Sequence, residues 1–348
     1  MLNVSFESVC RENLNRYPNM TAQDFIKLAF QSEFGPNHMI NDVSAVEKTI
    51  ITERENISAC SPAKYENISN WLCRFPIDKT HLSDEMIPLF ARLFKLTAES
   101  VCGSEQGFLK KLDVLRTLPV SDMENTISQY LESGICAISH SECYKTEYHP
   151  HYRLLKLDFA YYFDIFEKIE RLSRENKNIL IAIDGCCAGG KSSLSEILEK
   201  VFPCRVFHTD DFYLPVSKRA DNWHKTPAGN MDLKRLKAEV LQPAKDGGDI
   251  LSSAFDCSTQ SLKPPVFYKS ANITIVEGSY CLHPELRGFF DLKLFLSCSP
   301  QKQKERLILR EGDYFKAFEE IWIPLEQLYH RLCPIDEQTI VVSTDELW

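Results

Sequence analysis

Eight consecutive residues have the types and spacing of a phosphate-binding loop: Gly185-Cys-Cys-Ala-Gly-Gly-Lys-Ser192 matches the pattern G-x-x-x-x-G-K-[ST]. Glycines in such a loop let consecutive backbone N–H groups turn towards phosphate oxygens at the start of a helix, where the helix dipole also favours negative charge. We expect Lys191 to reach the β- and γ-phosphates of a nucleoside triphosphate, and Ser192 to bind Mg²⁺. The predicted nucleotide-binding residues are Gly185, Cys186, Cys187, Ala188, Gly189, Gly190, Lys191, Ser192 and Ser193.

Two acidic residues follow apolar runs further along the chain. Asp210 lies in Thr209-Asp-Asp-Phe-Tyr213, directly after the predicted strand 205–208. We predict that it is the base that accepts a hydroxyl proton. The alternative is a turn or a helix cap, where aspartate is common. Glu277 follows the apolar run 273–276, which predicts that it holds Mg²⁺ directly or through water.

Phosphoryl transfer also needs positive charge near the group that moves. A predicted helix from Pro300 carries Arg306 and Arg310, which are four residues apart and therefore share a face. We predict that both act as a lid over the phosphates. The alternative is a solvated helix face, the usual role of charged residues on a helix.

Two cysteines, Cys186 and Cys187, belong to the loop itself. The helix dipole and Lys191 would lower a thiol pKa at this place. Two interpretations follow: small side chains that fill the loop, or redox-sensitive thiols, for which reactivity needs exposure as well as charge.

The segments around these residues alternate in type after a polar linker at 171–178. Apolar runs of strand length are followed by segments with helical spacing, which predicts βαβ units and a parallel sheet covered on both faces. The phosphate-binding loop then lies at the carboxyl end of the first strand, where open α/β sheets bind their ligands. The predicted strands are 179–184, 205–208, 273–277, 292–297 and 339–342, and helices are predicted from about Lys191, Leu233, Pro300 and Phe315.

The first half of the chain has a different character and almost no strand signal. Thr21-Ala-Gln-Asp24 predicts a helix cap, and Ser121-Asp-Met-Glu124 predicts a capping box for the helix that follows it. The segment 154–169 is apolar and aromatic, and it is predicted to be helical. The sequence therefore predicts two domains: a mainly α-helical domain at 1–172, and an α/β domain of the P-loop NTPase type, with a parallel sheet and flanking helices, at 173–348.

Three of the nine histidines cluster in Ile138–Arg153, a segment with no apolar period. His140, His149 and His151 raise the alternative of a metal site, but their spacing matches no standard zinc pattern. The role of this first domain stays open among a regulator, a dimerisation platform and a second catalytic unit.

Composition restricts the partners of the protein. The formal net charge is −9 and no long Lys/Arg block occurs, which argues against general nucleic-acid binding. The thirteen cysteines form no C-x-x-C pair, the first residues lack the features of a secretion signal, and no apolar run approaches membrane-spanning length. These observations predict a cytoplasmic protein with reduced thiols and no membrane contact. They leave its oligomeric state, including a homo-oligomer, open.

From about Ile179 to its end, the chain resembles the uridine kinase branch of the uridine kinase/phosphoribulokinase family of P-loop kinases. The resemblance implies an ATP- and Mg²⁺-dependent kinase in which Asp210 is the general base, Asp232 binds the ribose hydroxyls, and Arg306 and Arg310 are lid arginines. Six stretches in the family's order carry it: Ile183–Ser192, His208–Tyr213, Gly229–Asp232, Ala254–Cys257, Val276–Tyr280 and Gln303–Arg310.

The expected nucleobase pocket departs from the family. Where uridine kinases have Tyr-Asp-Phe and then a base-reading histidine, this chain has Phe255-Asp256-Cys257 and then Gln260, so an aromatic wall and an imidazole are missing. Gln260 can still hydrogen-bond a pyrimidine edge, and Phe255 can still supply an apolar face. The predicted substrate-binding residues are Asp232, Tyr213, Phe255 and Gln260.

The sequence thus predicts phosphorylation of a hydroxyl on a small metabolite, first of all the 5′-hydroxyl of uridine or a similar nucleoside. Pantothenate, a sugar phosphate and glycerate are alternative acceptors. A nucleotide-dependent regulatory switch is the alternative from another class, although the guanine-reading N-K-x-D sequence of Ras-type switches is absent after the loop. A kinase half that only scaffolds is a third alternative, against which the presence of Lys191, Asp210 and Glu277 argues.

Overall fold

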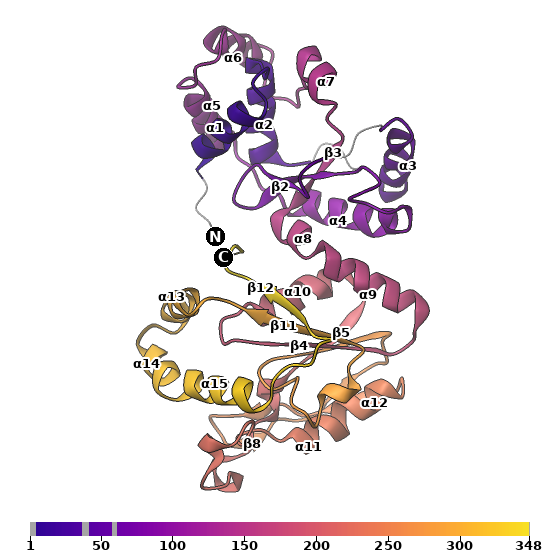
Figure 1. Ribbon diagram of the computed structural model, residues 1–348, viewed down its shortest axis with the longest axis vertical. Helices are drawn as coiled ribbons and strands as arrows, with labels where there is room; N and C mark the ends of the chain where they lie inside the picture. Colours follow the sequence, from indigo (N-terminus) through magenta and orange to yellow (C-terminus); the bar gives the residue numbers. More distant parts are fainter. Residues whose placement is uncertain (1–4, 37–41, 58–60, 348) are drawn as a thin grey trace. The chain divides into compact units, whose positions relative to one another are not determined.

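The computed structural model describes residues 5–36, 42–57 and 61–347 (Figure 1). The chain falls into two compact units, Met1–Glu167 and Lys168–Trp348, and each has a buried core of its own. The division lies within helix α9 (Phe163–Glu175), which also contains the predicted boundary between residues 172 and 173.

The C-terminal unit is built on a five-stranded parallel sheet, so the predicted α/β fold is confirmed. The spatial order of the strands is β12-β11-β4-β10-β5, which places the strand before the phosphate-binding loop in the centre. Each strand differs from its predicted range by at most one residue at either end. The strands are β4 (Ile179–Gly185), β5 (Cys204–His208), β10 (Ile273–Glu277), β11 (Leu292–Ser297) and β12 (Ile340–Ser343).

Helices cover both faces of this sheet (Figure 1). Alternate residues of a strand point to opposite faces, and Leu180 and Ala182 of β4 belong to a core cluster that includes Leu236, Ala244 and Tyr329. These three residues come from the helices α11 (Leu233–Leu236), α12 (Gln242–Lys245) and α15 (Ile323–Leu332). The other face is covered by α10 (Lys191–Val201).

Further strands and α-helices of the C-terminal unit lie in two segments that connect strands of the sheet. Two short antiparallel ribbons precede β10, and two helices precede α15. These elements are β6 (Ile250–Ser252) with β9 (Val266–Tyr268), β7 (Phe255–Asp256) with β8 (Ser261–Leu262), α13 (Pro300–Glu311) and α14 (Phe315–Ala317).

The N-terminal unit is mainly helical, as predicted. Its helices pack around a core of buried aliphatic and aromatic residues. They are α1 (Phe6–Arg16), α2 (Ala22–Phe34), α3 (Val43–Arg54), α4 (Ile87–Ser100), α5 (Glu105–Leu115), α6 (Met123–Glu132), α7 (Glu142–Tyr148) and α8 (Leu157–Tyr161).

This unit also contains a three-stranded antiparallel sheet, which the sequence did not predict. Its strands are β1 (Glu66–Asn67), β2 (Leu72–Pro76) and β3 (Tyr152–Lys156). The prediction of a helix over 154–169 was therefore wrong for its first residues. All residues of β2 are buried, so the strand lacks the alternation of apolar and polar residues that marks a half-exposed strand.

One of the two predicted caps in this unit forms and the other does not. Thr21 and Asp24 form a capping box at the start of α2, and the backbone N–H of Thr21 donates to Asp24 Oδ2 at 3.0 Å. The predicted box at 121–124 is wrong. The N-cap residue of α6 is Asp122, whose backbone has a left-handed conformation, and its side chain makes no capping hydrogen bond. Glu124 instead accepts a hydrogen bond from Arg116 Nε at 2.8 Å.

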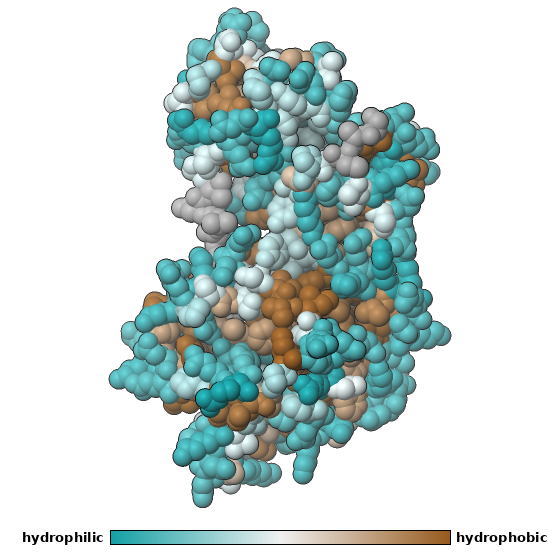
Figure 2. Space-filling view, viewed as in Figure 1, coloured by the Kyte–Doolittle hydropathy of each residue, from teal (hydrophilic) through white to brown (hydrophobic). Residues whose placement is uncertain are grey.

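The visible surface is mostly hydrophilic in both units, and its largest hydrophobic area lies in the C-terminal unit (Figure 2). Within the described residues, no helix combines the length and the apolar composition needed to cross a membrane.

Candidate active site

A cleft of about 290 Å³ lies at the carboxyl ends of β4, β5 and β10. Open α/β sheets bind their ligands at this edge. The cleft brings together the predicted phosphate-binding, metal-binding and proton-accepting side chains. Its lining includes Cys187, Ala188, Lys191, Ser192, Asp210, Tyr213, Asn230, Glu277, Arg310 and Glu326, with the aromatic residues Tyr280, Tyr314, Phe318 and Trp322.

The loop after β4 has the backbone that its glycines predict. Gly185 has a φ of 139° and Ala188 a φ of 55°, both in the region that favours glycine. A Cβ atom at Gly185 would lie 2.0 Å from the carbonyl oxygen of Leu296, so β11 leaves no room for a side chain there. Lys191 begins α10, and its Nζ donates to the carbonyl oxygens of Gly185 and Cys186, both at 2.9 Å.

Two side chains from the C-terminal helices hold this loop. Arg306 of α13 donates to the carbonyl oxygen of Ala188 at 3.2 Å and to Thr344 Oγ1 at 3.0 Å. Glu326 of α15 accepts a hydrogen bond from the backbone N–H of Cys187. A carboxylate thus binds one of the amides that such a loop offers to phosphate.

The proposed metal ligands are in contact with each other. Ser192 Oγ donates to Glu277 Oε1 at 3.0 Å, and the Glu277 side chain is only 6% exposed. His208 Nδ1 lies 2.6 Å from the same oxygen. This hydrogen bond to Glu277 raises the pKa of His208, against the opposing effect of burial. The serine hydroxyl and the carboxylate are hard oxygen donors of the kind that Mg²⁺ prefers.

Asp210 lies on a short 3-10 turn (Thr209–Phe212) directly after β5. Its carboxylate is exposed and borders the cleft. Tyr213 Oη donates to Asp210 Oδ1 at 2.8 Å. Burial and the neighbouring Asp210 raise the pKa of Tyr213 well above its ordinary value, so the hydroxyl stays protonated and orients the carboxylate.

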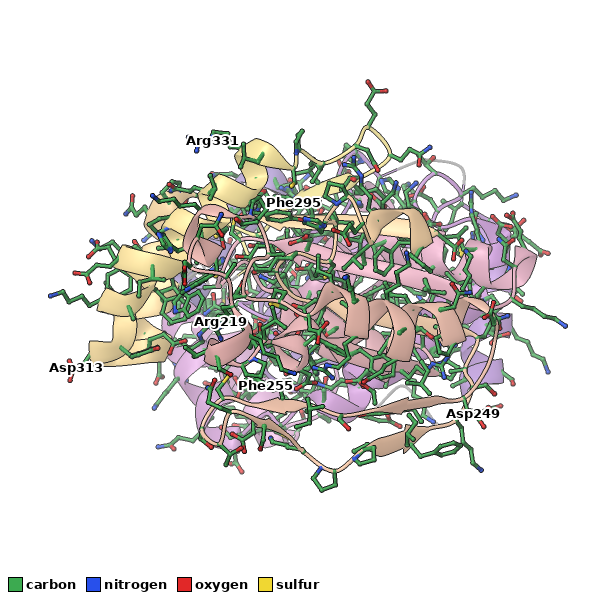
Figure 3. The ribbon with its side chains drawn as sticks, turned by 90° about the horizontal axis from the view of Figure 1, so that it is seen from below. Arg219, Asp249, Phe255, Phe295, Asp313 and Arg331 are labelled. Atoms are coloured by element: carbon green, nitrogen blue, oxygen red, sulfur yellow. The ribbon has the colours of Figure 1, made fainter. Side chains whose placement is uncertain are left out.

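Three of the four predicted substrate-binding residues lie outside the cleft lining. Asp232 caps α11 by accepting a backbone hydrogen bond at 3.0 Å. Gln260 is exposed, and its Nε2 donates to the carbonyl oxygen of Cys257 at 2.6 Å. Phe255, which is labelled in Figure 3, is buried in β7. Tyr213 alone of the four borders the cleft.

The two predicted lid arginines have different surroundings. Arg306 donates to the carbonyl oxygens of Ala188 and Thr344 and is not part of the cleft lining. Arg310 borders the cleft, and its guanidinium lies 5.6 Å from the ring centre of Phe318. Its Nε also donates to Glu311 at 2.6 Å. Asp313, in the turn that follows α13, points outward from the unit (Figure 3).

The loop thiols are protonated near neutral pH. Burial raises the pKa of Cys187 to about 12, and the charge of Glu326 adds to this shift. A hydrogen bond with Cys298, together with burial, raises the pKa of Cys186. The lowering that the helix dipole and Lys191 would cause is therefore outweighed in both thiols.

Several residues in or beside the cleft were missed in the sequence. His208 contacts Glu277 but is not part of the cleft lining; it ends a predicted strand two residues before Asp210, and that position was a usable signal. Asn230 is 2% exposed, and its Nδ2 has no hydrogen-bond partner among the described residues. Glu326 and the aromatic residues Tyr314, Phe318 and Trp322, which lie between α13 and α15, gave no signal, because only the folded chain brings them to the loop.

The metal-site alternative for the histidines of the N-terminal unit has no support. The described part of the chain contains no group of three or more His, Cys, Asp or Glu side chains placed to hold a metal ion. His140 Nδ1 lies 2.9 Å from Asp24 Oδ1, and His151 Nδ1 lies 2.9 Å from Glu53 Oε1.

No protein-family model and no curated protein matches this sequence. Two solved structures are similar to its C-terminal half. One, from Bacillus stearothermophilus, is described as a possible uridine kinase; it is 19% identical over 51% of this chain and 98% of that chain, with a TM-score of 0.35. The other, from Silicibacter sp., is described as a possible fructose transport system kinase; it is 19% identical over 50% of this chain and 94% of that chain, with a TM-score of 0.42. The function of this chain is therefore inferred from its own residues.

Proposed function

We propose that this chain is an ATP- and Mg²⁺-dependent kinase that transfers a phosphoryl group to a hydroxyl of a small metabolite, with a nucleoside such as uridine as the acceptor. The observation that supports this most is the convergence of Lys191, Ser192, Glu277 and Asp210 on one cleft. They lie at the carboxyl ends of three strands of the sheet, β4, β5 and β10. Phosphoryl transfer needs a phosphate cradle, a metal ion and a group that deprotonates or aims the acceptor, and these residues supply each of them.

In the proposed reaction, the loop amides and Lys191 hold the β- and γ-phosphates. Asp210 accepts the proton of the acceptor hydroxyl while the hydroxyl oxygen forms a bond to the γ-phosphorus. The bond between the γ-phosphorus and the β–γ bridging oxygen breaks, which releases ADP. The hydrogen bond from Tyr213 holds the carboxylate in place at 2.8 Å. Arg310, which borders the cleft, neutralises charge on the moving group.

The residues present fit a magnesium ion. Ser192 Oγ and Glu277 Oε1, 3.0 Å apart at the rim of the loop, would hold it. When bound, the ion neutralises charge on the phosphates. His208 contacts the same Glu277 oxygen at 2.6 Å and so restrains the carboxylate.

The cleft supports a flat acceptor with polar edges. Tyr280, Trp322 and Phe318 border it, and aromatic rings give a nucleobase a large apolar contact area. The buried Asn230 Nδ2, which has no partner among the described residues, would donate a hydrogen bond to the acceptor. Pantothenate, a sugar phosphate and glycerate offer no aromatic ring for such contacts.

A coupled ADP-release assay tests the proposal with nucleosides, pantothenate, ribulose 5-phosphate and glycerate. We expect nucleoside-dependent turnover that Asp210→Asn lowers by about 10²–10⁴-fold, the usual contribution of a general base. The exposed Asp221 lies outside the cleft, so Asp221→Asn is the matched control. An Asp210→Asn enzyme as active as the wild type would refute the assignment.

The same assay separates the kinase from a regulatory switch. A switch would hydrolyse ATP at a rate that no acceptor changes. Asn230→Ala adds a test of the acceptor site: we expect it to raise the acceptor KM while the Kd of ATP is retained.

A further inference from the structure

The N-terminal unit contains two adjoining hollows, of about 170 Å³ and about 370 Å³. Both are bordered by Lys27 of α2, by His140 and by Pro150. The first is also lined by Gln31 and Tyr152, and the second by Lys145 and His149, among others. These residues belong to the N-terminal compact unit and are not part of the lining of the kinase cleft.

A chain of hydrogen bonds with defined proton positions forms the inner wall. Asp24 is fully buried, and hydrogen bonds from His140 and Ser141 outweigh the effect of burial and lower its pKa, so it is ionised and can only accept. His140 therefore donates from Nδ1 to Asp24 at 2.9 Å, and its Nε2 accepts from Tyr152 Oη at 2.6 Å. Tyr152 Oη in turn accepts from Gln31 Nε2 at 3.1 Å.

A buried guanidinium ends this chain. Arg74 is 2% exposed, and its Nη2 donates to Gln31 Oε1 at 3.2 Å. Its Nε has no hydrogen-bond partner among the described residues. The carboxylate of Glu66 is 3.9 Å away and also pairs with Arg16 at 3.0 Å. The positive charge of Arg74 is thus only partly compensated.

Lys27 adds a second cation at the junction of the hollows. It is half-buried, and its Nζ donates to the carbonyl oxygen of Ile138 at 2.9 Å. The described residues give it no ion-pair partner. Burial and the charge of Arg74 lower the pKa of Lys27 to about 8. The nearby Glu53 is already engaged by Arg153 at 2.8 Å and by His151 at 2.9 Å.

We propose that these hollows bind a small metabolite through an oxyanion group, a carboxylate or a phosphate, that pairs with Lys27. Proteins rarely bury charges without partners, because desolvating an unpaired charge is costly. Lys27 is half-buried and has no ion-pair partner among the described residues, so an oxyanion beside it would reduce that cost and would add negative charge near Arg74. The apolar part of the ligand would contact Phe30, Phe94 and Leu154, which line the inner hollow.

Hydrogen exchange of the full chain tests the site, with inorganic phosphate, acetate and benzoate as separate probes in a chloride buffer. At a probe concentration ten times its Kd, binding slows exchange of globally protected amides in α2 and β3 about tenfold. Protection by phosphate alone would indicate that the ligand carries a phosphate group. Protection by benzoate or acetate would indicate that it carries a carboxylate. The absence of protection by all three would overturn the proposal.

Three variants make the test specific. Lys27→Met keeps the length of the side chain without its charge, and we expect it to abolish the protection; Lys27→Gln repeats the test if the first variant folds poorly. Lys110→Met removes an exposed lysine of α5 and should leave protection intact. Lys191→Met alters the phosphate-binding loop and should also leave protection of α2 intact. Protection that persists in both Lys27 variants would refute the site.

Discussion

At the scale of single residues, two arginines four positions apart on α13 differ in their contacts. Arg306 donates to the carbonyl oxygens of Ala188 and Thr344, whereas Arg310 is exposed and borders the cleft. We expect Arg306→Met to lower the free energy of unfolding by about 2 kcal/mol, because two carbonyls lose a charged donor. Arg310→Met should change it by less than about 0.5 kcal/mol, the usual effect at the surface, but should lower kcat by at least about tenfold.

Urea denaturation and ADP release measure the two effects of these substitutions separately. Equal losses of stability in both variants would show that Arg306 does not hold the loop. An unchanged kcat in Arg310→Met would remove that residue from the reaction.

The buried His140 contributes to the acid stability of the N-terminal unit. Burial lowers the pKa of His140 to about 4, against the opposing hydrogen bond to Asp24. In the unfolded chain His140 has its ordinary pKa of about 6.5. Between pH 4 and 6.5 the unfolded chain therefore binds more protons at this residue than the folded chain does. The stabilisation is complete above about pH 6.5 and falls, by on the order of 3 kcal/mol, as the pH decreases towards 4.

Hydrogen exchange of α2, corrected for the intrinsic effect of pH, measures this loss. We expect His140→Gln to flatten the pH dependence between about 6.5 and 4. The exposed His149 provides the control His149→Gln, which should keep the slope of the wild type. An unchanged slope in His140→Gln would contradict the assignment.

At the scale of elements, α15 contacts the phosphate-binding loop through the side chain of Glu326. Its carboxylate accepts the N–H of Cys187 and is held by Gln303 Nε2 at 3.0 Å. A bound phosphate would meet a negative charge that already occupies one loop amide. We expect Glu326→Gln to lower the Kd of ATP about tenfold, which corresponds to about 1.4 kcal/mol.

Isothermal titration with a non-hydrolysable ATP analogue measures this change in Kd. Glu337→Gln, which removes an exposed carboxylate of the same unit, is the control. A weaker affinity in Glu326→Gln would mean that the carboxylate supports the loop more than it competes with phosphate.

At the scale of the whole molecule, the two units have separate cores and separate proposed ligands. A ligand stabilises the state that binds it by RT ln(1 + [L]/Kd), about 2.7 kcal/mol at one hundred times Kd. We expect an ATP analogue with Mg²⁺ to slow exchange in β4, β10 and α10 and to leave α2 and α5 unchanged. Hydrogen exchange of the full chain checks this, and Lys191→Met should lose the effect.

The sheet of the C-terminal unit shows what could be predicted from local sequence. Its strands are short apolar runs, of which β4 and β10 are buried along their whole length, and the loop and Glu277 lie at the carboxyl ends of these two strands. Parallel strands end at the same edge, so their order along the chain was enough to group Lys191, Asp210 and Glu277. The sheet of the N-terminal unit had no such signal, because β2 and β3 pair across a long stretch of sequence.

An α/β unit with a phosphate-binding loop could be predicted from the amino-acid sequence, because a G-x-x-x-x-G-K-[ST] run between a strand and a helix is a property of adjacent residues. The tertiary structure decided which other residues reach the loop: it places Glu326 on a loop amide and keeps Asp232 and Gln260 out of the cleft lining. It also decided that Arg74 lies close enough to Lys27 for its charge to lower the pKa of that lysine. These contacts join residues far apart along the chain, and side-chain packing rather than local spacing fixes them.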